Sequence, residues 1–251
     1  MHDNLGNRMK SNYEDRSRPY LLRRTPVILR VDGKAFHTLT KSADKPFDQR
    51  IVGAMLSAAT TIAAEMQGFK AGFVQSDEAS FLLMDNDTIQ TEAWFDYNQQ
   101  KLVSVAASMM SVAFNTTEDF CMYRQARLGK TPWGVFDARA FNVPEETEVV
   151  NYFLWRAKDW ERNSINMYAR SFYSHKQLQG KSRAATLEML EADGHRWNEL
   201  PEQLKNGSWI SRGESGIQHQ TDIVPTFMRI NSWVGDQLYP QDLDEEPLDA
   251  E

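Results

Sequence analysis

Two short segments place acidic residues where apolar runs are interrupted. VILRVDGKAF (27–36) contains an apolar run that ends at Asp32, and FVQSDEASFLL (73–83) contains a second run that breaks at Asp77 and Glu78. A carboxylate at the end of a buried strand is costly unless a cation or hydrogen bonds hold it. Mg²⁺ prefers such hard oxygen ligands, and it often uses one or two carboxylates together with waters and substrate phosphates. The three acids therefore indicate a shared cation site.

The spacing alone leaves two interpretations open. Asp-Gly is also a common turn pair, so the acids could lie in two turns that face solvent. In a polymerase palm, however, the first strand supplies one metal-binding aspartate and an adjacent hairpin supplies another, which is the order found here. Gly33 would let successive backbone amides approach a triphosphate. Lys34 and His37 follow on the same loop, but this is not a P-loop, because the spaced glycines and the Lys-Ser/Thr ending are absent.

The elements that would position these acids follow from the hydrophobic pattern. Asp48 can cap a helix whose apolar residues recur at helical spacing until Gly68. The pattern predicts strands at 27–31, 71–75, 79–84 and within GVFDARAFNVP (134–144), and helices at 48–67 and 99–115. The order of strand, helix, hairpin, helix and strand predicts an α+β fold, a polymerase-palm-like (ferredoxin-like) antiparallel sheet with helices on one face.

The second half of the sequence has a different pattern. We expect a helical C-terminal part, with helices at 145–159, 162–175 and 183–192, and short strands or irregular structure over 209–233. No linker rich in Gly, Ser or Pro separates the halves. We therefore expect a palm-like catalytic region with an N-terminal arm (1–144) and a mainly helical region (145–235) to pack as one unit, followed by an acidic, flexible tail (236–251).

Composition and charge restrict the class of protein. The 251 residues are 41% hydrophobic and 25% charged, which allows a hydrophobic core. The seven acids of residues 236–251, where no base occurs, account for the whole net charge of −7. The neutral remainder, with local basic clusters, is compatible with a nucleic-acid enzyme. No apolar run reaches the roughly 18 residues of a membrane helix, and the polar N-terminus is not a signal peptide. The single cysteine, Cys121, excludes an internal disulfide and fits a cytoplasmic location.

Longer motifs carry a family resemblance. Three segments resemble the tRNA-His guanylyltransferase (Thg1) family, in this order: LRVDGKAFHTLTKSADKPFD, QSDEASFLL and FDARAF. A later segment is similar to the bacterial and phage Thg1-like branch. It reads YFLWRAKDWERNSINMYARSFYSHKQLQGKS and is followed by WNELP. The resemblance runs from residue 27 to residue 209. It implies a palm-like enzyme that adds nucleotides in the 3′-to-5′ direction to the 5′ end of tRNA.

The resemblance also assigns roles to residues. It implies that Asp32, Asp77 and Glu78 are catalytic and that they hold two Mg²⁺ ions, which Mn²⁺ can replace, together with the Gly33 carbonyl. It implies ATP, GTP and other nucleoside triphosphates as substrates. The nucleotide-binding residues would be Gly33, Lys34, Ala35, Phe36, His37, Lys45, Ser76 and Lys101. Asp137 and Arg139 match a family segment of structural or binding role.

A set of basic and amide residues is expected to bind the tRNA acceptor end or the incoming triphosphate. The set is Arg127, Lys130, Arg162, Asn163, Arg170, Lys176, Lys181 and Arg183. Any one of these residues could equally lie on a solvated helix face. The resemblance further implies a homotetramer, arranged as a dimer of dimers, and no membrane partner.

One departure from the family pattern bears on the substrate. Eukaryotic members carry a His-Ile-Asn-Asn motif that is tied to tRNA-His, whereas this sequence has ERNSIN at 161–166. The departure favours template-dependent repair of truncated tRNA 5′ ends. Two alternatives stay open: a strict tRNA-His guanylyltransferase that adds G at position −1, and a non-catalytic RNA-binding module on the same fold.

Overall fold

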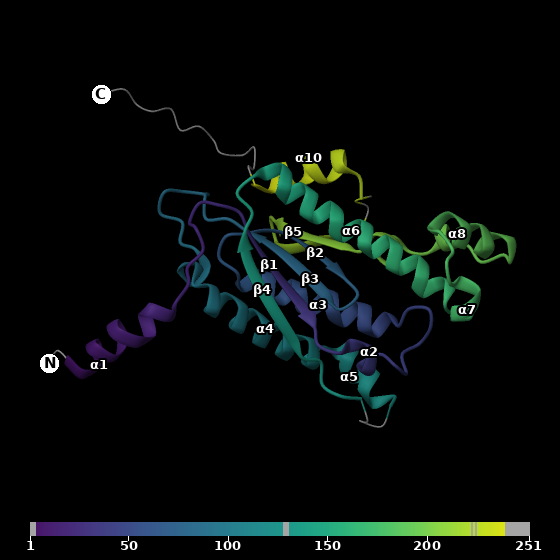
Figure 1. Ribbon diagram of the computed structural model, residues 1–251, viewed down its shortest axis with the longest axis horizontal. Coiled ribbons are helices and arrows are strands. Elements are labelled where there is room, and N and C mark those ends of the chain that lie inside the picture. Colours follow the sequence, from purple (N-terminus) through teal and green to yellow (C-terminus); the bar gives the residue numbers. More distant parts are fainter. Residues whose placement is uncertain (1–3, 128–130, 222, 224, 239–251) are drawn as a thin grey trace.

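A six-stranded sheet forms the centre of the protein, in a computed structural model that describes residues 4–127, 131–221, 223 and 225–238. The strand order is β4-β1-β3-β2-β5-β6, and every neighbouring pair is antiparallel (Figure 1). The strands are β1 (Val27–Gly33), β2 (Phe69–Gln75), β3 (Glu78–Leu83), β4 (Phe136–Asn142), β5 (Ser208–Gly213) and β6 (Gly216–Gln220). The expected antiparallel sheet is therefore present.

The helices fall before, between and after the strands. The α-helices are α1 (Asn4–Met9), α2 (Phe36–Leu39), α3 (Gln49–Glu65), α4 (Gln99–Thr116), α5 (Glu118–Gln125), α6 (Glu146–Ala169), α7 (His175–Leu178), α8 (Arg183–Ala192), α9 (Glu202–Asn206) and α10 (Phe227–Leu238). Short π- or 3₁₀-helical pieces are η1 (Lys10–Glu14), η2 (Asp15–Ser17), η3 (Trp94–Tyr97) and η4 (Trp197–Glu199). None of the helices in the described ranges is both long and apolar enough to span a bilayer.

One face of the sheet packs on α3 and α4. Alternate residues of β1, namely Val27, Leu29 and Val31, point to this face and are fully buried in its core. Helix α3 starts where expected, because the Asp48 side chain accepts a hydrogen bond from the Arg50 amide. Figure 1 shows both helices on the same side of the sheet.

The opposite face is covered by the C-terminal part of the chain. Ile28, on the other side of β1, belongs to a second core with Phe153 of α6 and Val234 of α10. Strand β5 pairs with β2, so residues beyond 144 also extend the sheet itself. Within the palm-like region the helices therefore lie on one face of the sheet. The helical C-terminal part covers the opposite face as a second helical layer (Figure 1).

Two expectations about the C-terminal half were wrong. Residues 145–175 do not form two helices that break near Asp159, because α6 runs without interruption through that position. Residues 209–233 contain the expected short strands, but α10 then runs from Phe227 to Leu238. Its buried residues Ile230, Val234 and Leu238 recur every four positions, which is a helical period. The predicted tail therefore begins inside a helix at Asp236, and its residues 239–251 lie outside the described part.

Candidate active site

The end of β1 meets the tip of the β2–β3 hairpin. The Gly33 amide donates a hydrogen bond to the Asp77 carbonyl oxygen, at 2.9 Å. Gln75 pairs with Glu78, so the hairpin loop consists only of Ser76 and Asp77. Ser76 has a left-handed backbone (φ 48°), a conformation that costs energy for a residue other than glycine and that often marks a functional turn. The structure therefore brings the two predicted acidic segments together.

Asp77 lies in an electrostatically unfavourable place. Burial raises the pKa of its carboxyl above the ordinary value, hydrogen bonds from the Ser76 hydroxyl and from its own amide partly offset this rise, and the nearby charges of Asp32 and Glu78 add to it. Asp32 and Asp77 line the same cavity. In the described ranges, neither residue forms an ion pair with a basic side chain. A divalent cation would relieve the repulsion between these two carboxylates.

The donor set fits Mg²⁺ bound together with a substrate. Among the described residues, no three His, Cys, Asp or Glu side chains converge closely enough to form an all-protein metal cage. Mg²⁺ seldom uses such a cage, and it usually takes one or two carboxylates plus waters and substrate phosphates. Asp32, Asp77 and the Gly33 carbonyl can supply that smaller set.

Glu78 is placed differently from the two aspartates. Its carboxylate accepts two hydrogen bonds from Arg156 of α6, from Nε to Oε1 and from Nη2 to Oε2, both 2.7 Å long. Both side chains are buried. This bidentate ion pair was not expected from the sequence, and it directs the Glu78 carboxylate toward α6.

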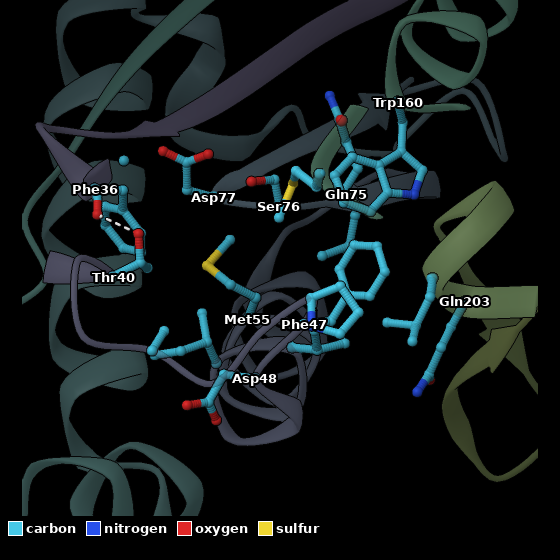
Figure 2. A pocket seen from close by; sticks show the side chains of 18 of the residues that line it. Phe36, Thr40, Phe47, Asp48, Met55, Gln75, Ser76, Asp77, Trp160 and Gln203 are labelled. Carbon is cyan, nitrogen blue, oxygen red and sulfur yellow. Dashed lines mark hydrogen bonds between the residues drawn. The ribbon is translucent and has the colours of Figure 1, made fainter. Parts of the chain in front are cut away.

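A largely apolar cavity of about 440 Å³ opens beside Asp77. Its volume lies within the range typical of small-molecule sites. Phe47 and Trp160 meet edge to face in its wall, with ring centroids 6.4 Å apart (Figure 2). Its lining includes the predicted nucleotide-binding residues Gly33, Ala35, Phe36, His37, Lys45 and Ser76. The cavity has the size and the aromatic walls that a nucleoside requires.

The loop that follows β1 offers fewer free amides than expected. The Gly33 amide is bonded to Asp77, and the Lys34 amide donates to the Val135 carbonyl at 2.7 Å. The amides of Ala35, Phe36 and His37 donate none of the loop hydrogen bonds found among the described residues. The amides available to a phosphate group are therefore those of residues 35–37.

A second, polar cavity of about 340 Å³ lies between the acids and α6. Asp32 lines it from the sheet, Asn163 and Asn166 line it from α6, and Arg170 lines it from the C-cap of that helix. The two cavities share five residues, Gln75, Ser76, Asp77, Trp160 and Met167. Asp77 therefore stands at the junction of an apolar and a polar compartment.

Arg127 is bound within the fold rather than free for RNA. It donates to the Ser42 carbonyl from Nη2 at 2.5 Å, and its guanidinium stacks over the Tyr123 ring at 3.8 Å. It also lies 3.5 Å from Asp48, whose carboxylate is held more tightly by Arg50. These contacts fix the loop over 42–48 that lines the apolar cavity.

Other predicted ligands lie away from both cavities. Lys101 is in the first turn of α4, whereas Asn115 in the last turn contacts Gly134 next to β4. Lys101 therefore lies about 21 Å along the helix axis from the end of α4 that contacts Gly134, at a rise of about 1.5 Å per residue. Five further predicted residues have exposed side chains and line neither cavity: Lys34, Arg162, Lys176, Lys181 and Arg183. Arg162 pairs with Asp159 and Arg183 pairs with Glu161, while Lys130 lies outside the described residues.

Several lining residues were missed from the sequence. The cavities are also lined by residues of the half that was expected to be mainly helical, namely Trp160, Asn166 and Met167 of α6 and Gln203 of α9. Arg156 did leave a signal, because it places a charge between the apolar core residues Phe153, Ala157 and Trp160. A buried charge in an apolar stripe requires a partner.

A family model described as tRNAHis guanylyltransferase (Thg1) matches residues 6–144, more than half of the chain. The chain belongs to the tRNAHis guanylyltransferase family. Members of this family are tRNA guanylyltransferases, and this Thg1-family chain is accordingly a nucleotidyltransferase. The recognition, the fold class and the enzyme class expected from the sequence are thereby confirmed.

Solved structures agree with this assignment. A bacterial tRNA(His) guanylyltransferase (Thg1)-like protein in complex with ATP is 37% identical, with a TM-score of 0.81 over 92% of this chain and 99% of that one. A bacterial Thg1-like protein in complex with GTP is 32% identical, with a TM-score of 0.72 over the same shares. The tRNA(His) guanylyltransferase of Schizosaccharomyces pombe is 30% identical over 80% of this chain and 79% of that protein.

Proposed function

We propose that this Thg1-family chain extends the 5′ end of tRNA in the 3′-to-5′ direction and repairs truncated 5′ ends in a template-dependent way. One observation carries the proposal: Asp77 stands where a nucleoside-sized cavity meets a polar cavity that also holds Asp32. A nucleoside triphosphate in the first cavity and an RNA end in the second would meet at the two carboxylates.

The reaction has two nucleotidyl transfers. An oxygen of the RNA 5′-monophosphate attacks the α-phosphorus of ATP or GTP, pyrophosphate leaves, and the 5′ end becomes nucleotidylated. The 3′-hydroxyl of an incoming nucleoside triphosphate then attacks the terminal RNA phosphorus, and AMP or GMP leaves. Magnesium held by Asp32, Asp77 and the Gly33 carbonyl would supply charge stabilisation at the phosphate oxygens and a lowered hydroxyl pKa.

The chain's own residues bind and orient the reactants. Phe47 and Trp160 would enclose the base of the activating nucleotide. The amides of residues 35–37, the Lys45 ammonium and the Ser76 hydroxyl would hold its phosphates. Two similar solved structures are complexes with ATP and with GTP, and this supports nucleotide binding by this chain.

The side chains of α6 would bind the RNA end. Asn163 and Arg170 line the polar cavity, so of the predicted RNA-binding set these two have the best access to the reacting phosphate. Ser164, which departs from the His-Ile-Asn-Asn motif, is buried, and its hydroxyl donates to the Leu204 carbonyl. It is thus a packing residue, and this supports repair over strict recognition of tRNA-His.

The experiment supplies ATP, all four nucleoside triphosphates and several 5′-monophosphorylated tRNAs that lack their first nucleotide. We expect restoration of the base complementary to the opposing 3′-strand nucleotide in more than one tRNA, with a nucleotidylated intermediate. Addition of G to tRNA-His alone, whatever the opposing base, would favour the strict enzyme. RNA binding without any transfer would favour the non-catalytic module. The tetramer and the cytoplasmic location stay predictions, testable by light scattering and cell fractionation.

A further inference from the structure

The backbone gathers three acids, but their side chains do not form a three-acid cluster. Asp32 of β1 is directly opposite Glu78 of β3, and Asp77 immediately precedes Glu78. Residues paired across antiparallel strands point to the same face of a sheet. Even so, no group of three possible metal ligands occurs within the described residues. The Glu78 carboxylate is bonded to Arg156 of α6.

Arg156 holds that carboxylate by both oxygens. The two hydrogen bonds are each 2.7 Å long, and both residues are only 7% exposed. Gln75 and Ser80 also direct donors at Oε1, at 3.5 Å. A parallel pair of charge-assisted hydrogen bonds is strong and geometrically specific. These hydrogen bonds therefore hold the Glu78 carboxylate against α6.

Arg156 is itself held in place on α6. Its Nη1 lies 3.4 Å from Asp159, one turn further along the helix, and its guanidinium lies over the Trp155 ring at 4.5 Å. Arg30 is the other cation near Glu78, but its Nε is 3.9 Å from the carboxylate, beyond hydrogen-bond distance. Among the described basic side chains, only Arg156 therefore bonds to Glu78.

We propose that Arg156 is a positioning residue that keeps Glu78 out of the metal-binding set, so that the acidic site presents two free carboxylates instead of three. The inference rests on the proposed function, because it concerns the same metal site. Two carboxylates leave coordination positions open for triphosphate oxygens, which Mg²⁺ sites of this kind require. A third free carboxylate would occupy such a position and would repel the triphosphate.

The test measures Mn²⁺ binding to the full chain without nucleotide or RNA, by electron paramagnetic resonance of the free ion. Glu78→Gln should leave the Mn²⁺ affinity within about twofold, whereas Asp32→Asn and Asp77→Asn should weaken it by about tenfold or more. Arg156→Met, which keeps the side-chain length without the charge, should strengthen Mn²⁺ binding by about tenfold, because ligand charge sets affinity. Arg156→Met/Glu78→Gln should lose that gain.

Two results would overturn the inference. One is a loss of Mn²⁺ affinity in Glu78→Gln as large as that in Asp77→Asn. The other is an unchanged or weaker affinity in an Arg156→Met protein that circular dichroism shows to be folded. If Arg156→Met does not fold, the comparison of Glu78→Gln with Asp77→Asn still decides. Unchanged binding in both aspartate variants would instead refute the metal site of the proposed function.

Discussion

The Gly33 amide and the Asp77 carbonyl oxygen are joined by a 2.9 Å hydrogen bond. This bond ties the last residue of β1 to the tip of the β2–β3 hairpin. Asp32, one residue before Gly33, and the Asp77 side chain are thereby held around one cavity. The geometry of the candidate active site therefore depends on backbone contacts as much as on the acidic side chains.

Gly33→Ala should destabilise the protein by about 1–3 kcal/mol, the usual effect of overpacking. A Cβ at this position would lie 2.3 Å from the Phe36 ring. That ring packs on both Phe114 and Phe136, so it has little room to move. Urea unfolding measures the effect. Gly235→Ala is the matched control: its Cβ meets nothing within 4 Å, and alanine should stabilise helix α10 by about 0.5–1 kcal/mol. Equal stability of the two variants would contradict the packing argument.

Asp77→Asn should abolish both transfers, with each rate falling by more than the roughly 10²–10³-fold that loss of one electrostatic group causes. The isosteric amide keeps the hairpin but removes the negative charge that holds a divalent cation. Single-turnover assays would separate formation of the nucleotidylated 5′ end from its attack by the incoming 3′-hydroxyl. Full activity of this variant with Mg²⁺ present would exclude Asp77 as a ligand.

The same variant should be more stable than the parent protein at neutral pH without metal. The folded protein raises the pKa of Asp77 above its ordinary value of 3.8, mainly through burial. Between the two pKa values the folded state binds more protons than the unfolded state, so stability falls as the pH rises through that window. Asn carries no such penalty. The difference in melting temperature should therefore be largest near pH 7 and vanish below the ordinary pKa, and a difference that grew toward low pH would contradict this sign.

Asp48→Asn should show the opposite pH dependence. Burial alone would raise the pKa of Asp48, but hydrogen bonds from Arg50 and from the Asp44 amide outweigh it and lower the pKa below 3.8. The stabilisation is present above the ordinary pKa and is lost as the pH falls through the lowered folded value. Asn can still cap α3, so the loss at pH 7 should be roughly 1.5–3 kcal/mol from the charge-assisted bonds.

The control for this prediction is Asp44→Asn. The Asp44 carboxylate also faces Arg50, at 2.6 Å, but its side chain is 71% exposed. Exposed ion pairs contribute about 0–1 kcal/mol. Chemical denaturation across pH 3–8 would compare the two variants, and a larger effect at Asp44 would mean that the buried network around Asp48 has been misassigned.

Arg170→Gln should weaken tRNA binding and reduce the dependence of affinity on salt. Arg170 lines the polar cavity of the candidate site. Removing one phosphate contact should lower the slope of log affinity against log salt by about 0.7–0.9. Arg183→Gln is a matched control, because Arg183 lies outside both cavities and is paired with Glu161 at 2.7 Å. Filter binding at several salt concentrations would measure both slopes. Equal slopes in the two variants would show that the position in the cavity does not matter.

Much of the site could be predicted because it depends on local sequence. The apolar runs fix two strands, and the acids that interrupt them lie at strand ends, so Asp32 and Asp77 were identified without coordinates. Lys101 and Arg127 show what this approach leaves open, because neither residue lines the two cavities. Lys101 lies in the first turn of α4, far from the candidate site. Arg127 donates a hydrogen bond to the Ser42 carbonyl and so holds that loop in place. Position along the chain does not reveal which way a long basic side chain turns.

The sequence by itself determined the family and the antiparallel palm-like sheet, and it predicted that Asp32, Asp77 and Glu78 share one site, because these depend on periodicity and on motifs within single elements. The tertiary structure alone decided that α6 crosses the second face of the sheet, where Trp160, Asn163 and Arg170 close the site. It also decided that Glu78 is paired with Arg156, 78 residues away in the chain. A buried charge must find its partner in space, and only the folded chain defines which groups are close enough to serve.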